Sequence, residues 1–146
     1  MKTVHKSVLI WYSPEEMFSL VTGVEHYPQF LPWCDHAAVL EQTSEGMPAE
    51  VGIAFSGIRQ TFVTRNTHEA GKRVQMHLVK GPFSRLDGDW HFHPVGDGTQ
   101  RACKVELLLN YGFDSAALAA LVGPVFDRIA GSMVDAFVKR AEQVYG

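Results

Sequence analysis

Six short segments that favour β-strands follow one another between residues 34 and 111, and they constrain the fold more than any other feature of the chain. Turn signals separate them, among them Gly81-Pro82 and the stretch from Pro94 to Gly98. The segments are 34–45, 48–56, 60–69, 73–79, 85–93 and 101–111. Because links this short cannot carry a crossover, consecutive strands must pair antiparallel. The sequence therefore predicts an antiparallel meander.

Alternation between apolar and polar residues is clearest in two of these segments. One face of the fifth segment carries Leu86, Gly88, Trp90 and Phe92. Its other face carries Asp87, Asp89, His91 and His93. The sixth segment alternates in the same way, with Val105, Leu107, Leu109 and Tyr111 on its apolar side. The pattern predicts a sheet with one apolar, aromatic face and one mostly polar face.

Helical patterns flank the strands on both sides. After a predicted strand over residues 3–11, Ser13-Pro14-Glu15-Glu16 supplies an N-cap, a proline at the first helical position and two acids in the first turn. A second short helix is predicted over 24–30. The longest helical pattern runs over 115–143, and Gly123-Pro124 predicts a kink or a fresh start within it, because proline cannot donate to a helix interior.

These elements predict one α+β domain over residues 1–146, in which a curved seven-stranded antiparallel sheet wraps around the long C-terminal helix. Glycines at Gly52, Gly57 and Gly88 permit curvature or close approach, and Met133 suits an adaptable apolar surface. These features favour a cavity between sheet and helix. The alternative, a fully packed core, stays open.

Composition and terminal sequence point to a cytosolic protein. Hydrophobic residues make up 46% of the chain, and no apolar run approaches the ~20 residues of a membrane span. The N-terminal residues lack the apolar segment and cleavage site of a secretory signal. The two cysteines, Cys34 and Cys103, lie far apart and form no metal motif, so two reduced thiols are expected. The sequence gives no oligomeric state.

Charge is unevenly distributed along the chain. The net charge is −3, but residues 59–104 contain eight lysines and arginines against four acids. This segment could present a basic face to anionic lipid or RNA, and the alternative is an ordinary solvated sheet surface. The candidate contacts for an anionic partner are Arg59, Arg65, Lys72 and Arg73.

Residues 27–34, Tyr-Pro-Gln-Phe-Leu-Pro-Trp-Cys, form an unusually bulky connection. Pro28 and Pro32 stiffen it and bias the preceding residues towards extended conformations. Connections are normally polar, so an aromatic one either packs on the core or serves as a cavity lid or partner contact. The sequence leaves both readings open.

Several motifs together resemble one family over residues 2–146. They are the stretches 13–18, 27–34, Lys80-Gly81-Pro82-Phe83, 86–92, Tyr111-Gly112-Phe113 and Gly123-Pro124-Val125-Phe126. The chain resembles the coenzyme Q-binding START-like family, which also includes the bacterial ribosome-association toxins. That family lies within the Bet v 1-like polyketide cyclase/dehydrase superfamily.

The resemblance implies a helix-grip fold with an elongated apolar tunnel. It implies non-enzymatic binding of ubiquinone or a similar isoprenoid lipid in support of respiratory electron transport, with transient contact to the inner membrane surface. The toxin branch implies an alternative, association with the large ribosomal subunit that blocks subunit joining. No cofactor is required under either reading, since the lipid would be the bound ligand.

The residues expected to line the tunnel come from the apolar sheet face and the long helix. They are Phe55, Val63, Leu78, Trp90, Phe92, Leu107, Leu109, Val122, Phe126, Ile129 and Met133. The mouth is expected at Tyr27, Phe30, Leu31, Trp33 and Phe83. Lys80 beside it could meet a lipid headgroup or simply be a solvated turn residue.

Catalytic and metal-binding patterns are weak by comparison. The superfamily contains cyclases and dehydratases, so such activity is the alternative to binding. His91 and His93 could share a metal, but they are expected on the polar face and a third ligand is not evident. His77 is interpreted as a strand histidine, and neither paired catalytic carboxylates nor a phosphate-binding glycine motif is recognisable. We therefore predict neither catalytic residues nor a metal site.

Overall fold

A computed structural model describes residues 2–40, 47–55 and 57–146, without the side chain of Phe55. The strands of this part of the chain are β1 (Lys2–Ile10), β2 (Cys34–Val39), β3 (Met47–Phe55), β4 (Ile58–Glu69), β5 (Arg73–Lys80), β6 (Phe83–Pro94) and β7 (Cys103–Phe113). The helices are α1 (Pro14–Thr22), the short 3-10 helix η1 (Val24–Gln29) and α2 (Ala116–Tyr145). The strands form one antiparallel sheet in the order β1-β7-β6-β5-β4-β3-β2.

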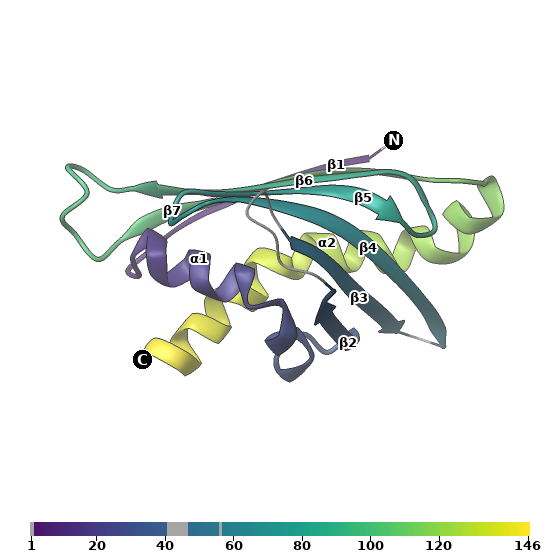
Figure 1. Ribbon diagram of the computed structural model, residues 1–146, viewed down its shortest axis with the longest axis horizontal. Helices are drawn as coiled ribbons and strands as arrows, with labels where there is room; N and C mark the ends of the chain where they lie inside the picture. Colours follow the sequence, from purple (N-terminus) through teal and green to yellow (C-terminus); the bar gives the residue numbers. More distant parts are fainter. Residues whose placement is uncertain (1, 41–46, 56) are drawn as a thin grey trace.

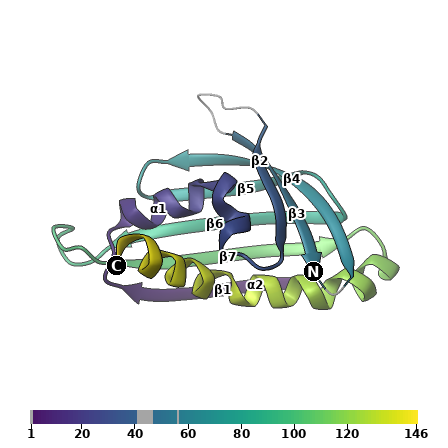
Figure 2. The same cartoon turned by 90° about the horizontal axis from the view of Figure 1, so that it is seen from below.

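The sheet curves around α2, which lies along its inner face together with α1 and η1 (Figures 1 and 2). The predicted α+β helix-grip architecture is confirmed, and each of the six predicted segments overlaps one strand. The predicted strand end at 41–45 lies outside the described residues. A bulge between β4 and β5, where Val63 pairs with Lys80 but Thr64 pairs with Leu78, bends the sheet near its middle.

Helix α1 begins as its sequence predicts. The Ser13 side chain accepts a hydrogen bond from the Glu16 amide at 3.1 Å, and the Glu16 carboxylate accepts one from the Ser13 amide at 2.9 Å. This capping box satisfies two N-terminal donors of the helix. Both Glu16 oxygens also accept from Arg101 at 2.8 Å, which ties the start of α1 to the loop after β6. The Arg101 hydrogen bonds lower the pKa of Glu16 to about 2.

Helix α2 is one element from Ala116 to Tyr145, so of the two predicted alternatives at Pro124, a kink or a fresh start, the fresh start is wrong. The proline leaves the carbonyl of Ala120 without its helical partner, and both residues lie on the exposed side of the helix, where water can compensate. By length and composition alone α2 could cross a membrane. Its inner side instead packs on the sheet, with Phe126 and Phe137 buried there.

The core between α2 and the sheet divides into two apolar clusters. One cluster joins α1 to the C-terminal half of α2 and includes Met17, Trp90 and Phe137. The other lies under the preceding half of α2 and includes Phe83 and Phe126. The cavity described next lies where the two clusters meet, because its walls include residues of both.

Candidate functional site

An internal cavity of about 60 Å³ lies between the inner sheet face, η1 and α2. Its walls are Tyr27, Trp33, Ala49, Val51, Phe62, Thr64, Asn66, Met76, Leu86, Trp90, Leu109, Phe126, Ile129, Met133 and Phe137. Pockets for small molecules typically enclose ~300–1,000 Å³, and a water molecule takes up ~30 Å³ of liquid. The elongated tunnel implied by the family resemblance is therefore not open in this conformation, and a ligand the size of ubiquinone would have to displace side chains.

The structure brings seven of the predicted site residues to this cavity: Tyr27, Trp33, Trp90, Leu109, Phe126, Ile129 and Met133. The remaining described ones do not line it: Phe30, Leu31, Val63, Leu78, Phe83, Phe92, Leu107 and Val122. The side chain of Phe55 lies outside the described residues.

Strand geometry explains the main errors in the predicted wall. Val63 lies between Phe62 and Thr64, so alternation puts it on the opposite face of β4. Phe92 and Leu107 do face inward, but they pack within the cluster beside α1 and do not reach the cavity. Val122 is buried at 1% exposure on α2 without reaching the cavity.

The predicted mouth is divided between two aromatic clusters. Tyr27 and Phe30 pack against Phe137, with ring centroids 5.5 and 5.2 Å away. Phe83 instead packs on Phe113 and Phe126, at 5.2 and 4.9 Å. In this conformation the five predicted residues do not form a single mouth. Of the five, Tyr27 and Trp33 reach the cavity itself.

The proline-stiffened segment is packed onto the core and covers one side of the cavity. Leu31 and Trp33 are 1% and 7% exposed. The Tyr27 hydroxyl donates to the carbonyl of Val21, and burial raises the pKa of Tyr27 above its usual range. Arg140 of α2 lies over the Phe30 ring at 5.1 Å and donates to the side-chain oxygen of Gln29 at 2.9 Å. These contacts fasten η1 to α2, and opening the cavity on this side would have to break them.

Two polar side chains, Thr64 and Asn66, interrupt the apolar wall. They are 4% and 5% exposed, and the Thr64 hydroxyl donates to the Asn66 Oδ1 at 2.8 Å. Sequence reasoning missed both, and it also missed Ala49, Val51, Phe62, Met76, Leu86 and Phe137. The signal was available in β4, because Phe62, Thr64 and Asn66 are spaced by two and must share one face.

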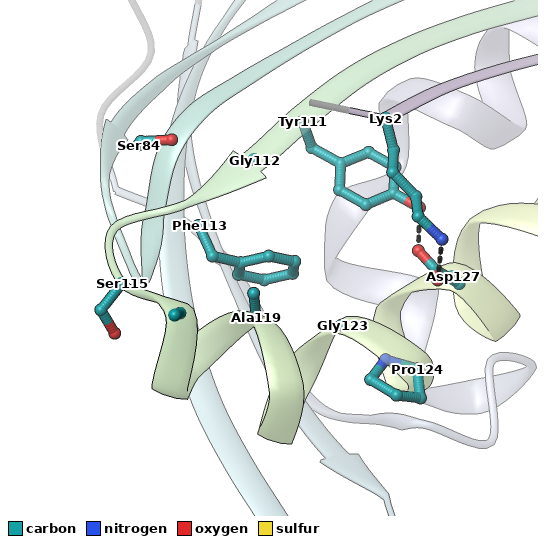
Figure 3. A pocket seen from close by; sticks show the side chains of 11 residues that line it. Lys2, Ser84, Tyr111, Gly112, Phe113, Ser115, Ala119, Gly123, Pro124 and Asp127 are labelled. Carbon is teal, nitrogen blue, oxygen red and sulfur yellow. Dashed lines mark hydrogen bonds and ion pairs between the residues drawn. The ribbon is translucent and has the colours of Figure 1, made fainter.

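A second, surface cleft of about 550 Å³ lies between β7 and the first half of α2 (Figure 3). Asp127 of α2 accepts hydrogen bonds there from the Tyr111 hydroxyl and, at 2.6 Å, from the Lys2 ammonium. Burial opposes ionisation of Asp127, but these two donors outweigh it and lower its pKa. Burial and the bond to Asp127 raise the pKa of Tyr111. The trio fastens β1, β7 and α2 together.

The outer sheet face carries contacts of carboxylates with arginine and histidine. Asp87 contacts Arg85 and His77, Asp89 contacts Arg73 and His91, and Glu106 contacts His5 and His93. The rings of His91 and His93 stack at 5.4 Å. Each of these two histidines thus meets a different carboxylate. Within the described part of the chain, no group of three or more His, Cys, Asp or Glu residues has the geometry of a metal site.

The residues predicted to contact an anionic partner fall into two pairs. Arg59 is 3.6 Å from Asp35, and Arg73 makes two hydrogen bonds to Asp89 at 2.9 and 2.6 Å. Arg65 and Lys72 are exposed, and among the described residues neither has an acid within ion-pair distance. Arg65 lies six positions after Arg59 on β4, which separates them by roughly 20 Å. The four residues form a row rather than a compact patch.

Both cysteines are free and buried. Burial raises the pKa of Cys34 and of Cys103 to about 11. Because the thiolate is the reactive form, neither thiol is suited to nucleophilic chemistry at neutral pH.

The fold and the apolar cavity define a START-like helix-grip protein. Residues 10–138 match the family described as "Polyketide cyclase / dehydrase and lipid transport", and the chain belongs to this family. Among solved structures, the Zhui aromatase/cyclase from Streptomyces sp. R1128 superposes with a TM-score of 0.85, covering 99% of this chain and 96% of that one. At 12% identity this likeness concerns the fold alone.

Two curated relatives carry different names. The ribosome association toxin RatA of Vibrio cholerae is 44% identical over 146 residues, which is 100% of this chain and 99% of the relative. A mitochondrial coenzyme Q-binding protein COQ10 homolog B of Xenopus laevis is 28% identical over 142 residues, covering 97% of this chain and 58% of the relative.

Proposed function

We propose that the protein associates with the ribosome through its large subunit and interferes with subunit joining. The observation that carries this proposal is the 44% identity, over the whole of both chains, to a relative named a ribosome association toxin. The buried thiols and the small, mostly apolar cavity support binding rather than catalysis as the activity.

Arg65 and Lys72 are the side chains best placed to meet rRNA phosphates on this surface. Both are exposed, whereas Arg59 and Arg73 already face Asp35 and Asp89. An arginine held by a carboxylate offers less net charge to a phosphate than an unpaired one. Each phosphate contact contributes roughly 0.7–0.9 to the slope of log affinity against log salt concentration.

Cosedimentation with purified large subunits over a salt series tests this proposal. We expect Arg65→Glu to weaken binding about tenfold at low salt and to flatten the salt dependence, and Lys72→Glu to add to the effect. Lys139→Glu is the matched control, since it makes the same charge change at an exposed position of α2, on the other side of the sheet. If Arg65→Glu and Lys139→Glu lowered the affinity for large subunits equally, Arg65 would not be a specific rRNA contact. A wild-type protein that never cosediments would overturn the function.

We propose a second function, binding of ubiquinone or a similar isoprenoid lipid, which the apolar lining of the cavity favours. The cavity walls are aromatic and aliphatic apart from one polar pair, as in many small-molecule sites. The family description names lipid transport, and one relative is named for coenzyme Q binding. Met76 and Met133, both in the wall, are flexible side chains that can move aside for a ligand.

Native mass spectrometry of protein purified without detergent, with analysis of its organic extract, tests lipid binding. A stoichiometric quinone or other isoprenoid is the expected result. Protein that stays empty and takes up no quinone from vesicles would exclude this function and leave the ribosome proposal unaffected.

A further inference from the structure

The polar pair Thr64–Asn66 is the one departure from an otherwise apolar inner surface in the described part of the chain. Apart from these two, the buried residues there are hydrophobic, tryptophan and tyrosine included, or glycine or proline. Both side chains come from β4 and point into the cavity, where they are 4% and 5% exposed. Burying a hydroxyl or an amide costs free energy unless it is hydrogen-bonded. Valine and leucine at these two positions would fill the same space without the free-energy cost of burying polar groups.

The bond within the pair satisfies only part of its hydrogen-bonding capacity. The Thr64 hydroxyl donates its proton to the Asn66 Oδ1 at 2.8 Å. An asparagine amide has two further N–H donors, and a threonine hydroxyl oxygen has two lone pairs. The Thr64 bond turns the Oδ1 end of the Asn66 amide towards Thr64, so the Nδ2 end can donate elsewhere.

Among the described residues, the neighbouring strands offer the pair no further side-chain partner. Across the sheet, Thr64 pairs with Ala49 and Leu78, and Asn66 pairs with Met47 and Met76. These neighbouring side chains carry no nitrogen or oxygen. Elsewhere in the wall, polar atoms belong to Trp33, Trp90 and Tyr27, and the Tyr27 hydroxyl already donates to the carbonyl of Val21.

We infer that Thr64 and Asn66 recognise a hydrogen-bond acceptor on the ligand, so the ligand is a largely apolar molecule bearing a carbonyl group, such as a quinone or ketone. The Asn66 amide donates to the carbonyl oxygen, and Thr64 holds the amide in orientation. The ligand's polar end therefore lies at β4 beneath α2, and its hydrocarbon part follows the aromatic wall. This inference rests on the proposed lipid-binding function and adds the chemistry that selects among lipids.

Binding of two probes with the same alkyl tail tests the inference. Decylubiquinone carries two carbonyls, whereas decylbenzene has no hydrogen-bond acceptor of that kind. Both affinities can be measured by isothermal titration calorimetry. Wild type should bind the quinone about tenfold more tightly than the hydrocarbon, the effect of one net hydrogen bond. Asn66→Leu and Thr64→Val should remove most of this preference and leave decylbenzene binding unchanged or stronger.

Thr61→Val is the matched control, because Thr61 is an exposed threonine of the same strand on the opposite face. Thr64→Ser keeps the hydroxyl and should keep the preference, which provides a second test should Asn66→Leu fold poorly. Equal affinities of wild type for the two probes would overturn the acceptor recognition but leave lipid binding standing. Binding of neither probe would overturn the lipid-binding function as well.

Discussion

The two faces of the sheet are stabilised by different kinds of contact, although the same strands form both. On β6, Trp90 is 1% exposed and packs against Phe137. Its neighbour His91, on the opposite face, is 35% exposed and lies 3.1 Å from Asp89. Close packing of apolar side chains stabilises the inner face. Contacts between carboxylates and basic side chains, exposed to water, stabilise the outer face. Mutations on the two faces should therefore differ in magnitude and in their dependence on pH.

Replacing adjacent residues of β6 is the strongest test of this difference. Trp90→Ala should destabilise the fold by about 3–5 kcal/mol, because it leaves a large void in a close-packed core. His91→Ala should cost less than about 0.5 kcal/mol, since it removes only an exposed contact. Urea unfolding followed by circular dichroism measures both. Similar losses from the two variants would contradict the assignment of the faces.

Replacing a glycine beside the cavity and one outside it with alanine tests whether cavity space matters for ligand binding. A Cβ at Gly88 would lie 2.2 Å from the Met76 Cε, so Gly88→Ala should push Met76 into the cavity. We expect a loss of about 1 kcal/mol in unfolding free energy and weaker decylubiquinone binding. The control is Gly52→Ala, where the Cβ would instead meet Asp35 and His36 at 2.2 Å, outside the cavity. Quinone binding that is weakened equally by both would show that cavity space is not the cause.

The smallest expected effect belongs to the outer face and depends on pH. Hydrogen bonds from His5 and His93 lower the pKa of Glu106 to about 2, and the Lys104 charge adds to this. Because the folded-state pKa lies below the unfolded value, the ionised carboxylate stabilises the fold above ~pH 4.5, and this contribution is lost as the pH falls towards 2.

Glu106→Gln should accordingly reduce stability by at most about 1 kcal/mol at neutral pH, since solvent screens a pair this exposed. The difference from wild type should shrink steadily between pH 5 and pH 3, as measured by urea midpoints. A difference that grows on acidification would mean that the carboxylate is not stabilised by its neighbours.

The elements of this fold were predictable because local sequence determines them. Alternation along β6 and β7 assigned the correct residues to the inner face, and Ser13 to Glu16 specified the start of α1. The continuous course of α2 was not predictable from Gly123-Pro124 alone. It depends on whether the carbonyl released by proline faces water, which only the packed structure decides.

The cavity was less predictable, because its walls depend on which inward-facing residues lie opposite one another. Trp90 and Phe92 share a face, yet Trp90 lines the cavity and Phe92 packs tightly beside α1. The Thr64–Asn66 pair was missed for another reason. The wall was predicted from apolar residues alone, whereas Thr64 and Asn66 are polar. Their spacing of two and four from Phe62 nevertheless puts them on the inner face of β4.

The pairing of β1 with β7 has a consequence for synthesis of the chain. Strand β1 lies at the edge of the sheet and pairs along its whole length with β7, from Lys2 opposite Tyr111 to Ile10 opposite Cys103. At ~5–20 residues per second, a translating ribosome needs roughly 5–20 s to add the intervening residues. During that interval the first strand is an unpaired edge, and the charged side chains of Lys2 and Lys6 help to keep it from pairing with other nascent chains.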